Sequence, residues 1–417
     1  MRPESQEPFV TASFSPRQER LLILLLAGVQ FTHLLDFMIV LPLGPEFMRL
    51  FSLSAAQFGT LVSSYTLASA AMGVLGLAWV DRFGRRSTLL VILGGFITAT
   101  LACGAAQSHA WLLVARSIAG GCAGLMGAVI MSIIADTIPG ERRGQAIGTV
   151  MSSLGLSAVA GVPLSLGMAN MLGWRAPFWA IGVLGALLWF GLLAVLPRLD
   201  AHVTTDSDRQ APSVTALFTP GFALGWLLTF SVAFSSFLLI PYLSAFMVGN
   251  LGLKQTDLPW VYLAGGAATL LAARQVGRWV DRFGPARVLG LLLVGTMVPH
   301  LGFTHLPAAP LPVVMVAFVL FMSLTSTRPI PTIALISAKV PPPLRGRYMA
   351  MNMAASDGAS GLAAWASGLM LATTPGGALV GFGLAGWLAV GVTTVSLFIL
   401  WTFGRSAVPL NAAPTPR

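Results

Sequence analysis

The sequence predicts an all-α membrane protein, with twelve transmembrane helices arranged in two pseudo-symmetric six-helix bundles. Two observations predict this fold. The chain of 417 residues is 56% hydrophobic and only 9% charged, whereas about a quarter of the residues of a soluble domain are charged. The hexapeptide Trp79–Gly84 also recurs unchanged as Trp279–Gly284, 200 residues later. A charged, turn-containing segment repeated at half the chain length indicates two copies of one membrane unit.

Each predicted helix is a run of about 20 apolar residues, enough to cross a bilayer core of about 30 Å. The runs of the first half lie at 21–43, 56–80, 88–106, 110–135, 145–170 and 177–197. Those of the second half lie at 219–247, 258–280, 288–306, 311–338, 347–371 and 378–403. We therefore expect an N-terminal bundle over 21–197 and a C-terminal bundle over 219–403. The remaining parts are an N-terminal segment over 1–20, a linker over 198–218 and a tail over 404–417.

The distribution of lysine and arginine predicts the orientation of the chain. Of the 24 basic residues, only Arg49, Arg175 and Lys254 fall in the loops on one side, and Arg116 and Arg328 fall inside helices. The other 19 lie on the side that carries both termini. Loops rich in lysine and arginine stay in the cytoplasm. We expect a multi-pass protein of the cell (inner) membrane with both termini cytoplasmic.

Composition also argues against several classes of protein. The net charge of +10 is spread in short clusters between the helices, so we expect a lipid bilayer rather than a nucleic acid as partner. No spacing of histidine, cysteine or carboxylates suits a metal site, and no nucleophile lies beside a base. We expect no cofactor, no metal and no enzymatic activity. A membrane-embedded enzyme is thus disfavoured.

The repeated hexapeptide falls in the loop after the second helix of each half. Gly84 permits a tight turn between helices, because glycine adopts backbone conformations that strain other residues. Asp81 lies at a helix end, where arginines or a helix N-terminus of the other half could hold it. Arg143-Gly144 is also echoed, as Arg345-Gly346. The echo is parallel, which matches halves related by an axis along the membrane normal.

On these residues the chain resembles the major facilitator superfamily, and within it the twelve-helix drug:proton antiporters of the sugar-efflux-permease-like branch. The segment Asp81-Arg82-Phe83-Gly84-Arg85-Arg86 is similar to the loop signature of that superfamily. The first copy departs from it with Leu77 at the position of the leading glycine. The second copy keeps Gly277 but has Pro285-Ala286 in place of the two arginines.

The resemblance implies a latch that closes the cytoplasmic side and breaks when the transporter switches. The simpler alternative is that these residues only anchor the loop in the cytoplasm. Asp136 ends the fourth helix near the same surface and is assigned to the same gate. The gate is expected to comprise Asp81, Arg82, Gly84, Arg85, Arg86, Asp136, Arg143, Gly277, Asp281, Arg282 and Gly284.

Two further helices carry patterns that resemble the family. The fifth helix has Gly161, Pro163 and Gly167, similar to the antiporter signature, although Leu166 replaces one glycine of its closing pair. Glycines allow close helix contacts, and proline bends a helix where its neighbours satisfy the freed carbonyl. In the fourth helix Arg116 precedes a glycine-rich stretch. Combined with the loop signature, the pattern of the fifth helix favours antiport over uptake.

Ionisable side chains inside the membrane are functional candidates, because a charge there is costly. Asp36 in the first helix and Arg116 in the fourth both lie about 10 Å below the external surface, so they could pair within the N-terminal half. His33 lies one turn from Asp36 on the same face. Asp36 is the preferred carrier of the coupling proton, and His33 could share that proton. The alternatives are a fixed bridge between helices and a histidine bonded within the core.

A second pair is expected in the C-terminal half. Arg328 in the tenth helix and Asp357 in the eleventh both lie about 15 Å from the cytoplasmic side. Pro329 and Pro331 are expected to distort the tenth helix beside the arginine. This pair too is either a proton-coupling site or a fixed bridge.

These features predict a monomeric secondary transporter that exports a small organic solute or drug in exchange for protons by alternating access. One alternative is a proton-coupled importer of a sugar or small metabolite. Another is a membrane sensor that kept the fold without transport. The sequence does not identify the solute, because the residues that face the cavity depend on how each helix is rotated.

Overall fold

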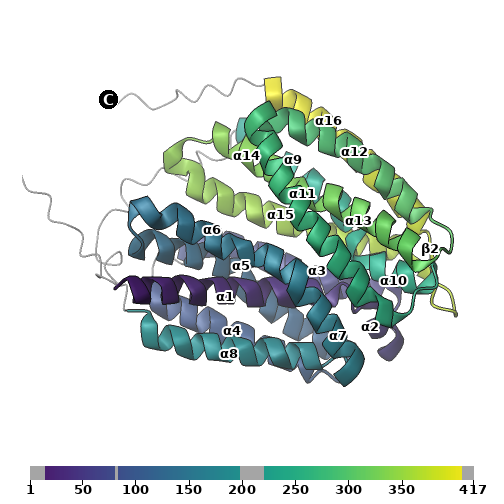
Figure 1. The fold of residues 1–417 in the computed structure, drawn as a ribbon, viewed down its shortest axis with the longest axis horizontal. Coiled ribbons are helices and arrows are strands. Elements are labelled where there is room, and N and C mark those ends of the chain that lie inside the picture. The colour runs from purple at the N-terminus through teal and green to yellow at the C-terminus, as the bar shows by residue number, and fades with distance from the viewer. Residues whose placement is uncertain (1–14, 80–82, 198–219, 406–417) are drawn as a thin grey trace, which may run out of the picture.

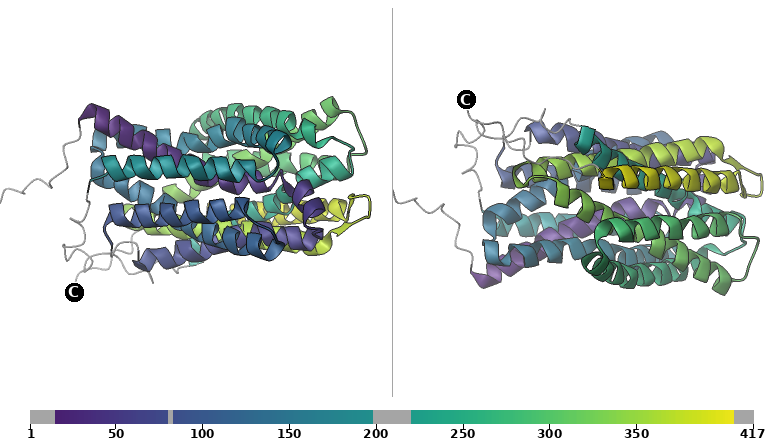
Figure 2. Two further views of the ribbon diagram at one scale, coloured as in Figure 1. Left: turned by 90° about the horizontal axis from the view of Figure 1, so that it is seen from below. Right: turned by 90° about the horizontal axis from the view of Figure 1, so that it is seen from above.

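The computed structural model describes residues 15–79, 83–197 and 220–405. Asp81 and Arg82 of the expected gate lie outside this part of the chain, as do the whole linker and most of both terminal segments. The described chain is almost entirely helical, and its helices run from left to right in all views, with those of the C-terminal half inclined to those of the N-terminal half in Figure 1 (Figures 1 and 2).

The N-terminal half contains six membrane-spanning segments. Five of them are the continuous helices α1 (Pro16–Val40), α3 (Ala55–Trp79), α4 (Arg85–Gly104), α5 (His109–Thr137) and α8 (Ala176–Val195). The remaining segment lies between α5 and α8 in the chain and has three parts: α6 (Gly140–Leu156), the π-helical turn η2 (Ser157–Gly161) and α7 (Val162–Leu172). The short helix α2 (Gly44–Leu50) connects the first two spans.

The C-terminal half repeats this plan. Its first span is α9 (Pro220–Phe237), the 3₁₀ turn η5 (Ile240–Tyr242) and α10 (Leu243–Gly249), followed by the turn η6 (Gln255–Asp257). The next spans are α11 (Leu258–Phe283), α12 (Pro285–Thr304), α13 (Leu311–Thr327) with α14 (Pro329–Lys339), α15 (Pro342–Met370) and α16 (Phe382–Arg405). A two-residue hairpin, β1 (Ala372–Thr373) with β2 (Leu379–Val380), joins the last two.

Composition alone identifies ten segments of the described chain as long and apolar enough to span a membrane. The other two spans are α11 and α15, with 26 and 29 residues. Both are long enough to cross, but α11 carries four charged residues near its end and α15 is rich in small and polar residues. The predicted twelve-helix fold is confirmed.

Prolines account for two of the helix breaks. Pro163 lies in the first turn of α7, immediately after the π turn η2. Proline has no N–H to donate, so the backbone hydrogen bonds of the helix are interrupted there. A Cβ at Gly161 would lie 2.8 Å from Leu35, so this glycine permits close contact with α1. Gly167 has no such neighbour within 4 Å. The tenth span breaks at Arg328, where Pro329 begins α14.

The two halves lie side by side, the N-terminal half below the C-terminal half in Figure 1. We call the end with the loops after α3, α5, α11 and α14 the basic end, and the opposite end, with α2, α10 and β2, the hairpin end. Helices α3 and α15 form one contact between the halves, and α11 meets the α6–η2–α7 span in the other. Glycines permit both contacts: a Cβ at Gly59 would lie 2.6 Å from Ala364 O, and one at Gly266 would lie 2.4 Å from Ala158 O.

Candidate functional site

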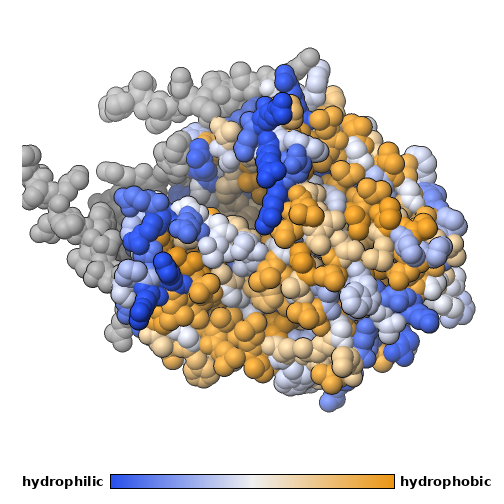
Figure 3. Space-filling view, viewed as in Figure 1, coloured by the Kyte–Doolittle hydropathy of each residue, from blue (hydrophilic) through white to orange (hydrophobic). Residues whose placement is uncertain are grey.

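A cavity of about 620 Å³ lies between the halves and is lined by α1, α3, α5 and α15. It extends to the basic end, since Gly76, Ser132, Gly346 and Arg347 near the helix ends belong to its wall. Figure 3 shows the surface hollowed between the two halves toward this end. Most of the wall is apolar, which suits a partly apolar solute of modest size.

The hairpin end is closed. Tyr242, wholly buried in the turn between α9 and α10, places its hydroxyl 3.1 Å from Ala55 O in α3 and 3.0 Å from Ala364 O in α15. The phenol thus bridges backbone groups of both halves. Nearby, the Asn250 side chain accepts from the N–H of Leu379 at 2.8 Å and donates to its carbonyl at 2.9 Å. The molecule is therefore open at its basic end and sealed at its hairpin end.

Asp36 and Arg116 form an ion pair behind the cavity wall. Arg116 Nη1 lies 2.6 Å from Asp36 Oδ2 and also donates to the Asp36 carbonyl at 3.1 Å. The side chains are 0% and 1% exposed. Asp36 Oδ1 and Arg116 Nε have no hydrogen-bond partner among the described residues. The pair joins α1 to α5 within the N-terminal half, so the predicted contact between these two residues is present.

Tyr65 separates this ion pair from the cavity. The Arg116 guanidinium carbon lies 4.1 Å from the centre of the Tyr65 ring, close enough for a cation–π contact. The ring also stacks on Phe37, with 5.4 Å between centroids, and both aromatic rings line the cavity. The Tyr65 hydroxyl donates to His33 O at 3.3 Å. Sequence reasoning missed Tyr65, because a lone tyrosine in an apolar helix has no distinguishing pattern.

His33 and Gln30 present a polar strip to the cavity from α1, three residues apart. His33 Nε2 and Gln30 Oε1 have no hydrogen-bond partner in the described chain. Buried polar atoms are normally paired. Both residues line the cavity, but these two atoms are themselves buried in its wall, so their hydrogen-bonding capacity is unused in this state.

The pair expected between Arg328 and Asp357 does not form; the structure corrects that prediction. The Arg328 side chain, 0% exposed, donates to Ser235 Oγ at 3.1 Å and Ser236 Oγ at 2.5 Å. It also donates to Thr325 O at 3.3 Å. All three partners are neutral.

Asp357 points toward the other half instead. Ser69 Oγ of α3 donates to Asp357 Oδ2 of α15 at 2.6 Å, on the cavity wall. The prediction failed because equal depth does not place two side chains on facing sides of their helices. Helix α13 ends beside Arg328, whose side chain reaches α9, whereas Asp357 lies on the side of α15 that packs against α3.

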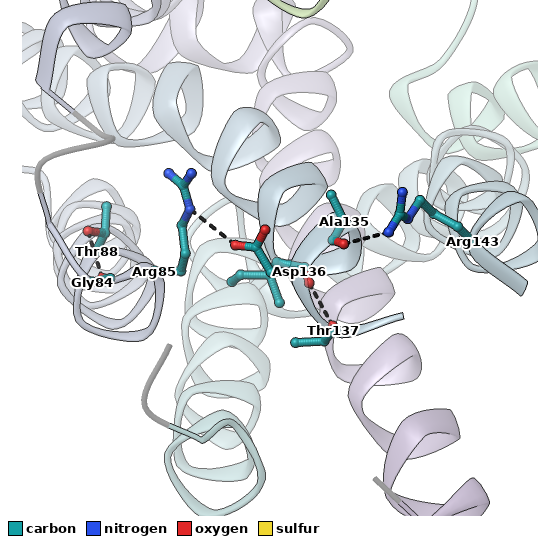
Figure 4. A network of polar contacts seen from close by, with 8 residues as sticks. Gly84, Arg85, Thr88, Ala135, Asp136, Thr137 and Arg143 are labelled. Atoms are coloured by element: carbon teal, nitrogen blue, oxygen red, sulfur yellow. Dashed lines mark hydrogen bonds and ion pairs between the residues drawn. The ribbon is translucent and has the colours of Figure 1, made fainter. Parts of the chain in front are cut away.

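The described part of the expected gate forms a polar network at the basic end of the N-terminal half (Figure 4). Arg85 Nε lies 3.4 Å from Asp136 Oδ2, and Arg143 donates to Ala135 O at 2.7 Å. Arg86 donates to Leu193 O at 2.7 Å. These contacts tie α4, α5, α6 and α8 together, so this part of the gate is bonded within one half in the present state.

The two repeat glycines differ in conformation. Gly284 has φ +85° and forms the tight turn between α11 and α12. Gly84 has φ −57° and ψ 132°, values open to other residues. The expectation that Gly84 needs the freedom of glycine is therefore wrong, and it applies to the second copy instead. There Asp281 and Arg282 are exposed in the last turn of α11, and Gly277 lies one turn earlier.

Among the described residues, no group of three or more histidine, cysteine or acidic side chains is arranged to hold a metal ion. The site therefore consists of an apolar cavity, a polar strip on α1, an ion pair behind Tyr65 and a carboxyl that contacts the opposite half. Such a site can bind a solute and exchange a proton, and it contains no evident covalent chemistry.

Comparisons with known proteins agree with this description. The family model described as Major Facilitator Superfamily matches residues 26–234 and 225–417. A chloramphenicol resistance protein of Streptomyces lividans is 29% identical over 79% of this chain and 88% of its own. A chloramphenicol efflux pump of Mycobacterium tuberculosis (strain ATCC 25618 / H37Rv) is 27% identical over 86% of each chain.

The fold also matches a solved structure. A bacterial homologue of the human lysosomal transporter Spinster, in an inward-facing and occupied conformation, superposes with a TM-score of 0.75. The superposition covers 96% of this chain and 100% of that one. Only 18% of the residues are identical, so this likeness concerns the fold alone.

Proposed function

Because this chain belongs to the major facilitator superfamily, we propose that it exports a small organic solute from the cell in exchange for protons. Membership makes the chain a multi-pass membrane transporter rather than an enzyme. The two halves would rock about the cavity and open it to each side in turn. The names of two relatives, a chloramphenicol resistance protein and a chloramphenicol efflux pump, favour export over import.

The proposal places the basic end in the cytoplasm of the cell (inner) membrane, because loops rich in arginine are retained there. Both chain termini then lie in the cytoplasm. In this orientation the cavity opens to the cytoplasm, the side from which an exporter collects its solute. One chain supplies both halves and the whole cavity wall, so the transporter is proposed to act as a monomer.

The position of Tyr65 is the observation that carries the proposal. One face of its ring holds the guanidinium of Arg116, and the residue also lines the cavity. A solute that displaces Tyr65 or Phe37 therefore disturbs the environment of the ion pair. Conversely, breaking the ion pair frees Arg116 to move against the aromatic wall. Solute binding and proton binding are thereby linked through one side chain.

Asp36 is the proposed proton carrier. A proton taken up from outside neutralises its carboxylate and removes the charge that holds Arg116. Release of the proton to the cytoplasm restores the ion pair, so the state described here follows proton release. His33 is the proposed relay, since it lies one turn from Asp36, lines the cavity, and has a buried Nε2 with no hydrogen-bond partner among the described residues.

The cavity supports a neutral or weakly polar solute as cargo. Phe37 and Tyr65 offer an aromatic surface, and the polar residues Gln30 and His33 line the same wall. Chloramphenicol is the first probe to test, because two relatives bear its name and it combines an aromatic ring with hydroxyl and amide groups.

The test is transport in proteoliposomes with an imposed pH gradient and a panel of solutes that begins with chloramphenicol. We expect solute to move against the proton flux, and Asp36→Asn to abolish that coupling while solute exchange without a gradient remains. Asp257→Asn is the matched control, since Asp257 lies at the hairpin end, away from the cavity.

Three outcomes contradict the proposal. Movement of solute and protons in the same direction identifies an importer. Proton-coupled flux in Asp36→Asn assigns the proton to another group. Solute binding without flux in any gradient identifies a sensor that kept the fold.

A further inference from the structure

Three arginines form a stripe along one side of α11. Arg274, Arg278 and Arg282 are four residues apart, so they lie one above the other on the helix surface. All three side chains are exposed. None of them lies within salt-bridge distance of a described carboxylate, and Asp281 in the same turn makes no such bridge either. We call these three residues the arginine stripe.

The arginine stripe continues a lipid-facing surface. Leu271 lies three residues before Arg274, and Trp260 lies eleven residues before Leu271, which is three helical turns on the same side. Leu271 is 65% exposed and Trp260 63%. Large apolar side chains this exposed on a membrane helix contact lipid tails. The same side of α11 therefore runs from apolar to basic as it approaches the basic end.

The stripe also borders the opening between the halves. Gly155 of α6 is packed against Leu270, since a Cβ there would lie 3.0 Å from the leucine side chain. Arg274 is one turn further toward the basic end, at the edge of this contact. Figure 3 shows strongly hydrophilic residues gathered beside the hollow at the basic end of α11. The guanidinium groups thus stand beside the contact between α6 and α11, which belong to opposite halves.

The depth of Arg274 favours an anionic partner. Arg274 lies nine residues before the helix end at Phe283, about 13 Å along the axis at 1.5 Å per residue. A guanidinium this far from the helix end must reach toward the headgroups of the lipids. Basic pockets between helices on the cytoplasmic side bind anionic lipid headgroups.

The first copy of the repeat lacks this surface. The positions 200 residues earlier are Val74, Ala78 and Arg82, so two of the three arginines have apolar counterparts. Val74 is 43% exposed, like the apolar side chains of an ordinary lipid-facing helix. The arginine stripe is therefore a property of the C-terminal half and not of the duplicated unit.

We propose that the arginine stripe binds an anionic phospholipid of the cytoplasmic leaflet, with its phosphate on Arg274 and Arg278 and its tails against Leu271, beside the contact between α6 and α11. The proposal rests on the orientation given under the proposed function, but not on the solute or on proton coupling. Lipid bound there lies next to the helices that separate in the inward-open state, so it favours that state.

The test measures thermal unfolding of the purified full-length protein titrated with dioleoyl-phosphatidylglycerol or dioleoyl-phosphatidylcholine in mixed micelles. We expect phosphatidylglycerol to raise the unfolding temperature of the natural protein at lower concentration than phosphatidylcholine. Arg274→Gln and Arg278→Gln are each expected to weaken this effect about fivefold, the factor that corresponds to one arginine near an anionic surface.

Two controls separate a site from general attraction. Arg287→Gln removes an exposed arginine of α12 at the same end and is expected to leave the titration unchanged. Arg274→Lys with Arg278→Lys keeps the charges and is expected to retain most of the preference. Equal effects of both lipids, or an equal loss in Arg287→Gln, would overturn the proposal. These results leave solute transport as a separate question, because no flux is measured.

Discussion

Buried charges are arranged differently in the two halves: the N-terminal half pairs its charges internally, whereas the C-terminal half directs its acid to the interface between the halves. In the N-terminal half, Arg116 and Asp36 neutralise each other at 2.6 Å. In the C-terminal half, Arg328 is surrounded by hydroxyl and carbonyl groups, and Asp357 takes its hydrogen bond from Ser69 across the interface. The two arginines are equally buried. Among the described residues, however, only Arg116 has a carboxylate among its contacts.

The difference separates two tasks. Under the proposed mechanism, a contact inside one half keeps its partners while the halves rock, so the Asp36–Arg116 pair changes through protonation or through movement of Tyr65. A contact between halves can be made and broken in each cycle, as Ser69–Asp357 and the Tyr242 bridge can. The duplicated halves have thus diverged: one acid is paired with an arginine inside its own half, and the other is directed to the interface.

The largest expected effect comes from removing one partner of the ion pair. Arg116→Met leaves the Asp36 carboxylate buried without a counter-charge, which costs about 3–5 kcal/mol of unfolding free energy. Arg328→Met leaves only the neutral serines without a donor, a cost of about 1–3 kcal/mol. Thermal unfolding in detergent compares the two variants. If Arg328→Met proves the more damaging, an anionic partner of Arg328 has been overlooked and the comparison fails.

The sequence predicted the contact within the N-terminal half because both charged residues lie on inward sides of continuous helices at one depth. The same reasoning failed for Arg328 and Asp357. Depth follows from counting residues, but the direction of a side chain depends on helix rotation and on the break before Pro329. Contacts between halves were also beyond prediction: Ser69 and Tyr242 are single polar residues in apolar segments. The repeat, the helix count and the breaks at proline were readable because length, composition and proline act locally.

A smaller effect is expected at the contact between the halves. Ser69→Ala removes the hydrogen bond to Asp357, which is worth about 1.5 kcal/mol or more when the acceptor is charged. We expect this loss to shift the equilibrium between the two states about tenfold, away from the state open at the basic end and toward the state open at the hairpin end. Spin labels at Gln145→Cys and Arg287→Cys, with Cys103 and Cys122 replaced by alanine, report the separation of the halves at the basic end.

Ser117→Ala is the matched control for that measurement. Its hydroxyl bonds only the Leu113 carbonyl within α5, at 2.9 Å, so the distance distribution should not change. A lower unfolding temperature of Ser69→Ala without any change in distances would mean that Ser69 and Asp357 stay together in both states. The Ser69–Asp357 contact would then be part of the pivot, and the Tyr242 bridge at the hairpin end would remain as the contact between halves that breaks in each cycle.

The smallest effect is expected at Tyr242. Tyr242→Phe keeps the ring but removes the hydroxyl that lies 3.1 Å from Ala55 O and 3.0 Å from Ala364 O. A neutral hydrogen bond is worth about 1 kcal/mol, so the outward-open population should rise about fivefold. Tyr262→Phe is the control, because its hydroxyl bonds Ser244 at 2.7 Å within the same half. The same spin-label distances should shift in Tyr242→Phe and not in Tyr262→Phe. Equal shifts would show that losing any buried hydroxyl loosens the structure, and that closure of the hairpin end does not depend on a contact between the halves.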